Sequence, residues 1–194
     1  YNKAQIEYIE QPEIKPKIIK ISNRYLLELN NNLDDNNDLL TNNIIKFFKS
    51  KSIKSFNLKS PYDTGKTQML DKIITKYNFK RILWLSYRKT LTNDIMGTLG
   101  KKHKFTDYQK GNCQSNRIII QIESIFKITD SEVFDIIIEV PSYDLVIIDE
   151  VESILSQFNS PTFKGKSKEC FEFLEGVITN SKKLITLDGD LGNR

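Results

Sequence analysis

The segment from residue 59 to 68 reads Lys-Ser-Pro-Tyr-Asp-Thr-Gly-Lys-Thr-Gln and contains the residue types of a phosphate-binding loop. In such a loop a tight turn between a strand and a helix aims backbone N–H groups at phosphate oxygens, and Gly65 would allow the close approach. Lys66 would reach the β- and γ-phosphates, and the Thr67 hydroxyl would take a position on Mg²⁺. The N-terminus of the following helix adds a positive dipole. These residues predict a nucleotide site.

Two residues depart from the usual GxxxxGK[ST] pattern of this loop. Ser60 stands at the position of the first glycine, and Asp63 occupies a position where many such loops carry a small residue. A carboxylate beside phosphates is electrostatically unfavourable, so Asp63 is expected to point toward solvent. The predicted ATP-binding residues are Ser60, Asp63, Thr64, Gly65, Lys66 and Thr67.

A second segment ends an apolar run with two acids, Asp149 and Glu150. The run over residues 145–148 is typical of a buried strand, and ligands of open α/β sheets bind at the carboxyl ends of strands. Asp149 would hold Mg²⁺ through a water, and Glu150 would orient the water that attacks the γ-phosphate. Alone, the pair could equally be a strand end with Asp149 as a helix cap. With the upstream loop, it predicts nucleoside triphosphate binding, with Lys66 and Glu150 as the catalytic residues.

Strand-like and helix-like segments alternate along the chain and would position these residues. Helical periodicity predicts helices over 66–77, 89–99 and 167–180, with Gly100 as a stop signal and a further short helix over 123–128. Apolar runs predict strands over 53–59, 81–86, 117–122, 145–148 and 183–187. This alternation predicts an α/β fold with a mostly parallel sheet covered by helices on both faces. Residues 1–43 are expected to be an arm and an Asn/Asp-rich loop, in which a short helix could begin near Asp38, and residues 44–194 the folded domain.

Composition excludes several classes of protein. Two cysteines cannot form a disulfide framework, and neither has the neighbours of a zinc site. No apolar run approaches the length of a membrane span, and no signal peptide is visible. From residue 40 to 62 there are five lysines and no acid, which suits a phosphate backbone but is also typical of a solvated surface. His103 lies beside lysines and is expected at the surface, whereas Trp84 is expected in the core.

The strings SPYDTGKT, DEVESILSQF and LDGDLGNR together resemble the herpesvirus-type replication origin-binding proteins, which are superfamily 2 DNA helicases with relatives in other large DNA viruses. The resemblance covers residues 53–194, and the DEVES string is its most specific part. Relatives typically carry glycine at position 63, so Asp63 is a departure. The resemblance implies a RecA-like P-loop NTPase domain, the first of two motor domains. The second would lie elsewhere in a longer protein, because both ends of this chain look cut.

The resemblance also implies roles for residues beyond the nucleotide site. Ser86 and Arg88 would contact the backbone of a bound DNA strand, together with Gln121 and Ser124 in the next strand-contacting motif. Residues that would couple the nucleotide site to the DNA are Glu152, Asp188 and Asp190.

The resulting expectation is an ATP- and Mg²⁺-dependent DNA helicase motor that acts in binding and unwinding a replication origin. Its partners would be single-stranded or origin-duplex DNA, the second motor domain and other replication proteins, with no membrane. Its location would be intracellular, in the nucleus or a cytoplasmic replication site of a host cell. Two alternatives remain open: another P-loop NTPase linked to nucleic acid, and a degenerate ATP-binding domain that serves as a DNA-binding or assembly module, which Asp63 suggests.

Overall fold

The computed structural model describes residues 39–61, 63–111, 113–129, 140–163 and 165–189. Within them the chain forms a six-stranded sheet in the order β1-β6-β5-β2-β4-β3, and each neighbouring pair is parallel. The strands are β1 (Ser55–Lys59), β2 (Ile82–Ser86), β3 (Thr106–Asp107), β4 (Arg117–Gln121), β5 (Leu145–Asp149) and β6 (Leu184–Asp188). The expected parallel α/β architecture is confirmed.

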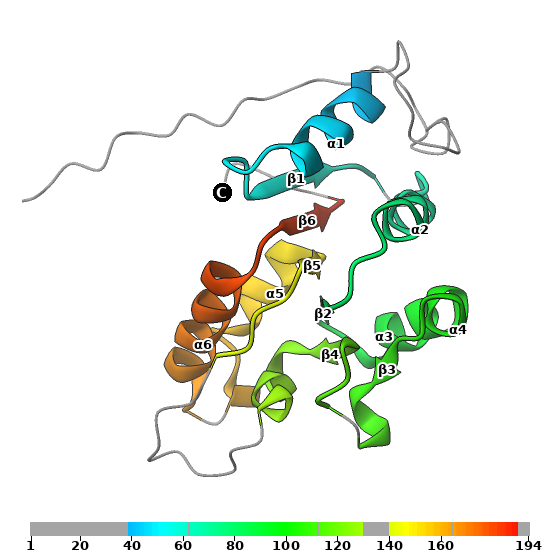
Figure 1. Cartoon of the computed structure of the whole chain (residues 1–194). Helices are drawn as coiled ribbons and strands as arrows, with labels where there is room; N and C mark the ends of the chain where they lie inside the picture. The colour runs from blue at the N-terminus through cyan, green and yellow to red at the C-terminus, as the bar shows by residue number, and fades with distance from the viewer. Residues whose placement is uncertain (1–38, 62, 112, 130–139, 164, 190–194) are drawn as a thin grey trace, which may run out of the picture.

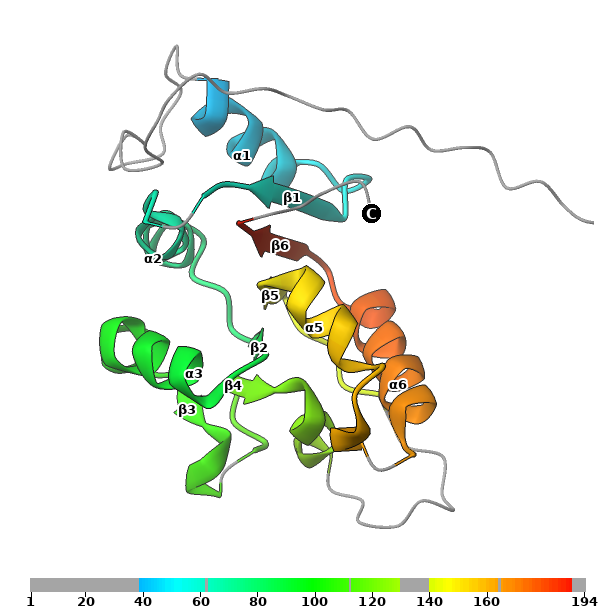
Figure 2. The ribbon, with the colours of Figure 1, turned by 180° about the vertical axis from the view of Figure 1, so that it is seen from behind.

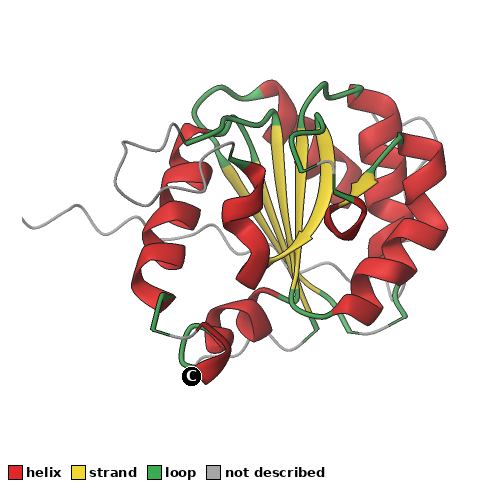
Figure 3. Ribbon diagram, turned by 90° about the horizontal axis from the view of Figure 1, so that it is seen from below, coloured by secondary structure: helices red, strands yellow, loops and turns green. Residues whose placement is uncertain are grey.

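Helices cover both faces of this sheet (Figures 1, 2 and 3). One face carries α1 (Leu39–Lys49), α2 (Lys66–Tyr77) and α3 (Lys89–Ile95), whereas the other carries α5 (Val151–Gln157), α6 (Ser167–Asn180) and the 3₁₀ helix Ile122–Ile128. Alternate residues of β2 enter different cores, with Trp84 facing α2 and Leu83 facing α6. Because successive side chains of a strand point to opposite faces, a continuous apolar run is what a doubly covered sheet requires.

The first core layer is built from the periodic apolar positions of α2. They are Met69, Leu70, Ile73 and Ile74, each at most 1% exposed. Trp84 packs into the same layer and is fully buried, as its place in an apolar strand predicted. The helix predicted over 66–77 therefore has the bounds and the buried face that its sequence pattern indicated.

The helix after β2 does not end at Gly100, so this stop signal was wrong. α3 continues through a π-helical turn, Met96–Gly100, into α4 (Lys101–His103), and the left-handed residue Lys104 ends it. A Cβ at position 100 would lie 2.9 Å from the Cε of Met96. Gly100 itself is helical, with φ at −55°, and the sequence pattern does not distinguish a glycine inside a helix from one that ends it.

The surface position expected for His103 was also wrong, because the residue is only 5% exposed. Its Nε2 lies 2.6 Å from Oδ1 of Asp71, and Lys102 donates to the other oxygen of that carboxylate at 2.6 Å. Burial alone would raise the pKa of Asp71, but the bonds from Lys102 and His103 hold it below its ordinary value. This cluster joins α4 to α2, the helix that follows the predicted phosphate loop.

α1 begins at Leu39, five residues before the expected domain boundary at residue 44, and buries Leu40. The ammonium of Lys183 fixes the end of this helix to the sheet by donating to the carbonyl oxygens of Phe47, Ser50 and Ile53 at 2.6–2.7 Å. Desolvation at this position lowers the pKa of Lys183. Residues 1–38 of the expected arm lie outside the described residues. Among the described residues, no helix is long and apolar enough to cross a membrane.

Candidate nucleotide and nucleic-acid site

The predicted phosphate loop connects β1 to α2 at the carboxyl edge of the sheet. Gly65 precedes the helix with φ at 90°, a left-handed conformation in which glycine is favoured. The loop is closed by its own hydroxyls: Ser60 Oγ and Thr64 Oγ1 lie 2.5 Å apart, and Thr64 also donates to the carbonyl of Pro61. Ser60, which departs from the usual glycine, therefore takes part in the closure of the loop.

Asp63 lies in the same loop with φ at 59°, and the residue is exposed. Aspartate enters the left-handed region more readily than most residues, so the backbone tolerates it there. The expectation that the Asp63 side chain avoids the interior of the loop agrees with this exposure.

Lys66 begins α2, and its ammonium lies at the centre of the candidate site. Its Nζ donates to the carbonyl of Ser60 at 3.0 Å and lies 3.6 Å from Oε1 of Glu150. The Lys66 side chain is only 11% exposed, and that of Glu150 only 10%. The structure thus brings together a lysine and a glutamate that are 84 positions apart in the sequence. Thr67 follows on the first turn of α2 and is partly exposed.

Asp149 and Glu150 are both 7% exposed at the end of β5. Burial and the charge of Glu150 raise the pKa of Asp149 to about 6, against the opposing effects of Lys66 and of a backbone N–H. Two adjacent buried carboxylates repel each other, and a positive charge at this edge of the sheet stabilises their ionised forms. Glu150 has φ at 57°, which is uncommon for a non-glycine residue and gives the sharp turn from β5 into α5.

β6 lies between β1 and β5 and connects the two halves of the site. Its last residue, Asp188, pairs in register with Lys59, and its carbonyl accepts a hydrogen bond from Ser60 N at 2.9 Å. The Asp188 side chain is buried, and its Oδ2 accepts from the backbone N–H of Glu152 at 2.8 Å. The contact expected between Asp188 and the Glu152 region is present. Asp190 lies outside the described residues.

The donor set fits a nucleoside triphosphate with Mg²⁺. Among the described residues no group of three or more His, Cys, Asp or Glu side chains could hold a metal by itself. Mg²⁺ commonly binds through one or two protein oxygens together with substrate phosphates and waters, and Thr67 and Asp149 could supply the protein oxygens. Lys66 could bind the phosphates beside them.

The four residues expected at DNA lie near the ends of β2 and β4, which are neighbours in the sheet. Ser86 and Gln121 are register partners. The Ser86 side chain is fully buried, and its hydroxyl lies 2.6 Å from that of Thr92, so it is not presented at the surface in this conformation. Arg88 precedes α3 and is exposed, with its guanidinium 4.7 Å from the centre of the Tyr87 ring. Of the two residues in this turn, Arg88 is the accessible one.

Gln121 has a partner that sequence reasoning missed. The hydroxyl of Tyr108 donates to Oε1 of Gln121. Ser124 lies on the 3₁₀ helix Ile122–Ile128 and is partly exposed. Lys127 Nζ lies 5.4 Å from the centre of the Tyr108 ring. No sequence signal pointed to Tyr108, because it follows a two-residue strand at the edge of the sheet.

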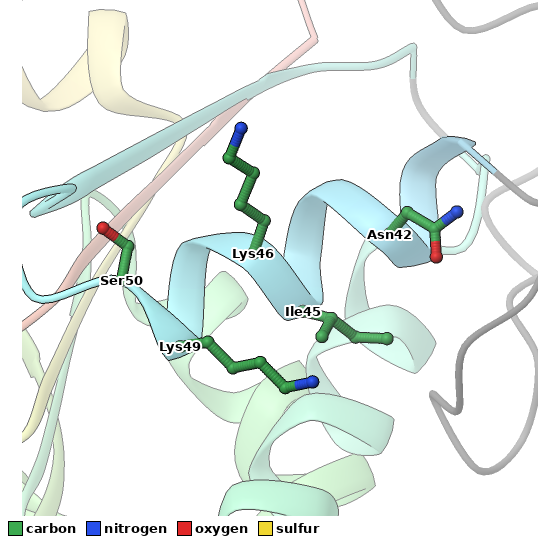
Figure 4. A pocket seen from close by; sticks show the side chains of 5 residues that line it. All are labelled: Asn42, Ile45, Lys46, Lys49 and Ser50. Carbon is green, nitrogen blue, oxygen red and sulfur yellow. The ribbon is translucent and has the colours of Figure 1, made fainter.

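The lysine-rich segment does not form an anion site around the hollow on α1. Figure 4 shows the side chains that line this hollow, Asn42, Ile45, Lys46, Lys49 and Ser50. Lys46 and Lys49 point in different directions from the helix, so their ammonium groups do not converge on one point.

Comparison with known proteins gives three results. The family described as "Origin of replication binding protein" matches residues 43–194. A mimivirus protein (Acanthamoeba polyphaga mimivirus) named as a replication origin-binding protein is 38% identical over 183 residues, which are 90% of this chain and 23% of that protein. A second protein of the same virus, named as an uncharacterized helicase, is 35% identical over 90% of this chain and 16% of its own length. The chain thus spans less than a quarter of either relative.

The fold has a solved counterpart in the Sulfolobus solfataricus SWI2/SNF2 ATPase core in complex with dsDNA. The TM-score is 0.54 at 14% identity, over 89% of this chain and 34% of that one. The two chains therefore share a fold, a RecA-like α/β domain with a parallel sheet. With the family match over residues 43–194, the chain belongs to the family of origin of replication binding proteins.

Proposed function

We propose that this chain is the ATP-binding motor domain of a DNA helicase that binds and unwinds a viral replication origin. The observation that carries the proposal is the convergence of Lys66, the Asp149–Glu150 pair and Asp188 at the carboxyl ends of β1, β5 and β6. Support also comes from the family to which the chain belongs and from relatives named for origin binding and helicase activity.

In this proposal the loop 60–65 and Lys66 bind the phosphates of ATP. Bound Mg²⁺ would neutralise charge that develops on the transferring phosphoryl group. Thr67 and Asp149 would hold the ion, and Glu150 would orient and deprotonate the attacking water. The distance of 3.6 Å between Nζ of Lys66 and Oε1 of Glu150 supports these neighbouring roles. Asp149 must be ionised to bind a cation, and the positive charge of the ion favours its ionised form.

The nucleic acid would cross the neighbouring strand ends, where Arg88, Gln121 and Ser124 lie. Contacts of this kind reach sugar and phosphate and carry no base information, so origin recognition would require other parts of the longer protein. The second motor domain would supply an arginine finger, and further replication proteins are expected partners.

The alternatives differ in what nucleic acid does to ATP hydrolysis. The test is steady-state ATPase activity, with and without single-stranded DNA, of a chain that carries this domain together with a second motor domain. We expect stimulation by DNA. Hydrolysis without stimulation would favour another P-loop NTPase, and binding of ATP without hydrolysis would favour a DNA-binding or assembly module. A Glu150→Gln variant controls for contaminating ATPases.

A further inference from the structure

Helix α5 connects the candidate nucleotide site to the turn that carries Arg88. At its N-terminus it is held by Glu150, whose carbonyl accepts from Ile154 N at 3.0 Å, and by the bond from Glu152 N to Asp188. At its C-terminus Gln157 Nε2 donates to the carbonyl of Tyr87 at 2.9 Å. The helix is seven residues long, about 10 Å at 1.5 Å per residue.

Gln157 and Tyr87 are 70 positions apart in the sequence and belong to α5 and to the turn after β2. Tyr87 in turn carries the guanidinium of Arg88 over its ring at 4.7 Å. The amide of Gln157 thus holds the peptide next to the exposed arginine. A shift of α5 would move that peptide or break the bond.

The oxygen of the Gln157 amide differs from its nitrogen in lacking a hydrogen bond within the described part of the chain. Gln157 Oε1 is buried and has no hydrogen-bond partner among the described residues. A buried acceptor without a donor is costly, by roughly 1–3 kcal/mol. The amide therefore has a reason to adopt a second arrangement when the turn offers a donor, for example a backbone N–H after a rotation of the Tyr87–Arg88 peptide.

We propose that Gln157 is a positioning residue that transmits the state of the nucleotide site along α5 to the Tyr87–Arg88 turn, and so sets how tightly the chain binds a DNA strand when nucleotide is present. The inference rests on the proposed function, because it needs both ligands. Gln157 contacts neither ligand itself. Its effect is on the coupling between two binding events and not on either event alone.

The test is a linkage measurement on the 194-residue chain. Fluorescence anisotropy gives the Kd of a labelled 20-nucleotide oligothymidylate, with and without a saturating Mg²⁺ complex of a non-hydrolysable ATP analogue. For the unchanged chain we expect the two Kd values to differ by about 5-fold or more, in the range of typical coupling. Gln157→Met keeps the length of the side chain but cannot donate a hydrogen bond. For this variant we expect the Kd values for DNA with and without the analogue to differ by less than 2-fold. Its separate affinities for analogue and DNA stay within about 3-fold of those of the unchanged chain.

Two further variants keep the test decisive. Gln157→Glu also removes the donor and guards against a folding defect of the methionine variant, and we expect it to lose the coupling as well. Gln114→Met makes the matched change at an exposed glutamine, and its coupling ratio should not change. Coupling that persists in both Gln157 variants overturns the inference. The inference is also overturned if the unchanged chain binds both ligands but has the same Kd for DNA with and without the analogue. That result leaves the proposed function intact. An unchanged chain that binds neither ligand overturns both.

Discussion

The backbone N–H of Glu152 donates a hydrogen bond to Oδ2 of Asp188, so the first turn of α5 is attached to the end of β6. The carbonyl of the same Asp188 accepts from Ser60 at the start of the phosphate loop. One aspartate thus contacts both walls of the candidate nucleotide site. This explains how residues at the ends of three strands are held in one geometry.

Removing this carboxylate should destabilise the chain. Asp188→Ala leaves the partly buried N–H of Glu152 without its acceptor, and we expect the free energy of unfolding to fall by about 1 kcal/mol. Asp188→Asn keeps an acceptor oxygen and should lose less. Urea denaturation measures both, with the exposed Asp94→Ala as the control. Equal stability of Asp188→Ala and the unchanged chain would show that the bond contributes nothing.

The raised pKa of Asp149 should appear in the pH dependence of stability. Its value in the folded chain is about 6, and in the unfolded chain about 3.9. Between these values the folded state retains a proton that the unfolded state has lost, so this group makes the free energy of unfolding fall as the pH rises from about 4 to about 6.

Asp149→Asn cannot titrate and should lack that contribution. Its stability relative to the unchanged chain should therefore increase from pH 4 to pH 6, by about 1–3 kcal/mol, and stay constant above. Denaturant titrations at several pH values without nucleotide measure this difference. A difference that is flat over this range would mean that Asp149 titrates normally.

Glu150→Gln should separate binding from turnover. The amide has the shape of the carboxylate but cannot accept the proton of the attacking water, so DNA-stimulated turnover by the chain with its second motor domain should be lost. Binding of ATP to the variant should persist in the same preparation. If kcat stayed within a few-fold of that of the unchanged protein, Glu150 would not be the base.

Arg88→Ala should weaken DNA binding without altering sequence preference. An arginine on phosphate contributes about one released counterion, so the slope of log K against log salt should become shallower by about one. Anisotropy with oligonucleotides of different sequence, over a salt series, measures both effects. Lys168→Ala on α6 is the control. A loss confined to one sequence would mean that Arg88 reads bases.

The central strands β2 and β5 could be predicted because they are buried on both faces, and such strands have continuous apolar runs such as 82–85 and 145–148. β1 lies at the edge of the sheet, and most of its residues are exposed. The phosphate loop was predicted from its Thr-Gly-Lys-Thr residues. The acids after β5 were predicted as site residues because ligands of open α/β sheets bind at the carboxyl ends of strands.

What the sequence did not reveal depends on side-chain contacts that no sequence pattern indicates. His103 is buried because Asp71, 32 positions away, accepts from it. Gly100 lies inside a helix that continues to His103, although glycine is also common at helix ends. The buried state of Ser86 depends on Thr92, and the partner of Gln121 is a tyrosine beside a strand too short to show a pattern. None of these pairs has a local signal.

Lys66 is proposed to bind the phosphates of ATP, and calorimetric titration of the 194-residue chain with Mg-ATP tests this directly. We expect binding with a stoichiometry of one for the unchanged chain and for Lys101→Ala, an exposed lysine after the π-helical turn. Lys66→Ala should show no binding while keeping its far-ultraviolet circular dichroism and its unfolding cooperativity, because loss of a phosphate contact creates no cavity in the core. Binding of Mg-ATP to Lys66→Ala with unchanged affinity would contradict the assignment of the nucleotide site.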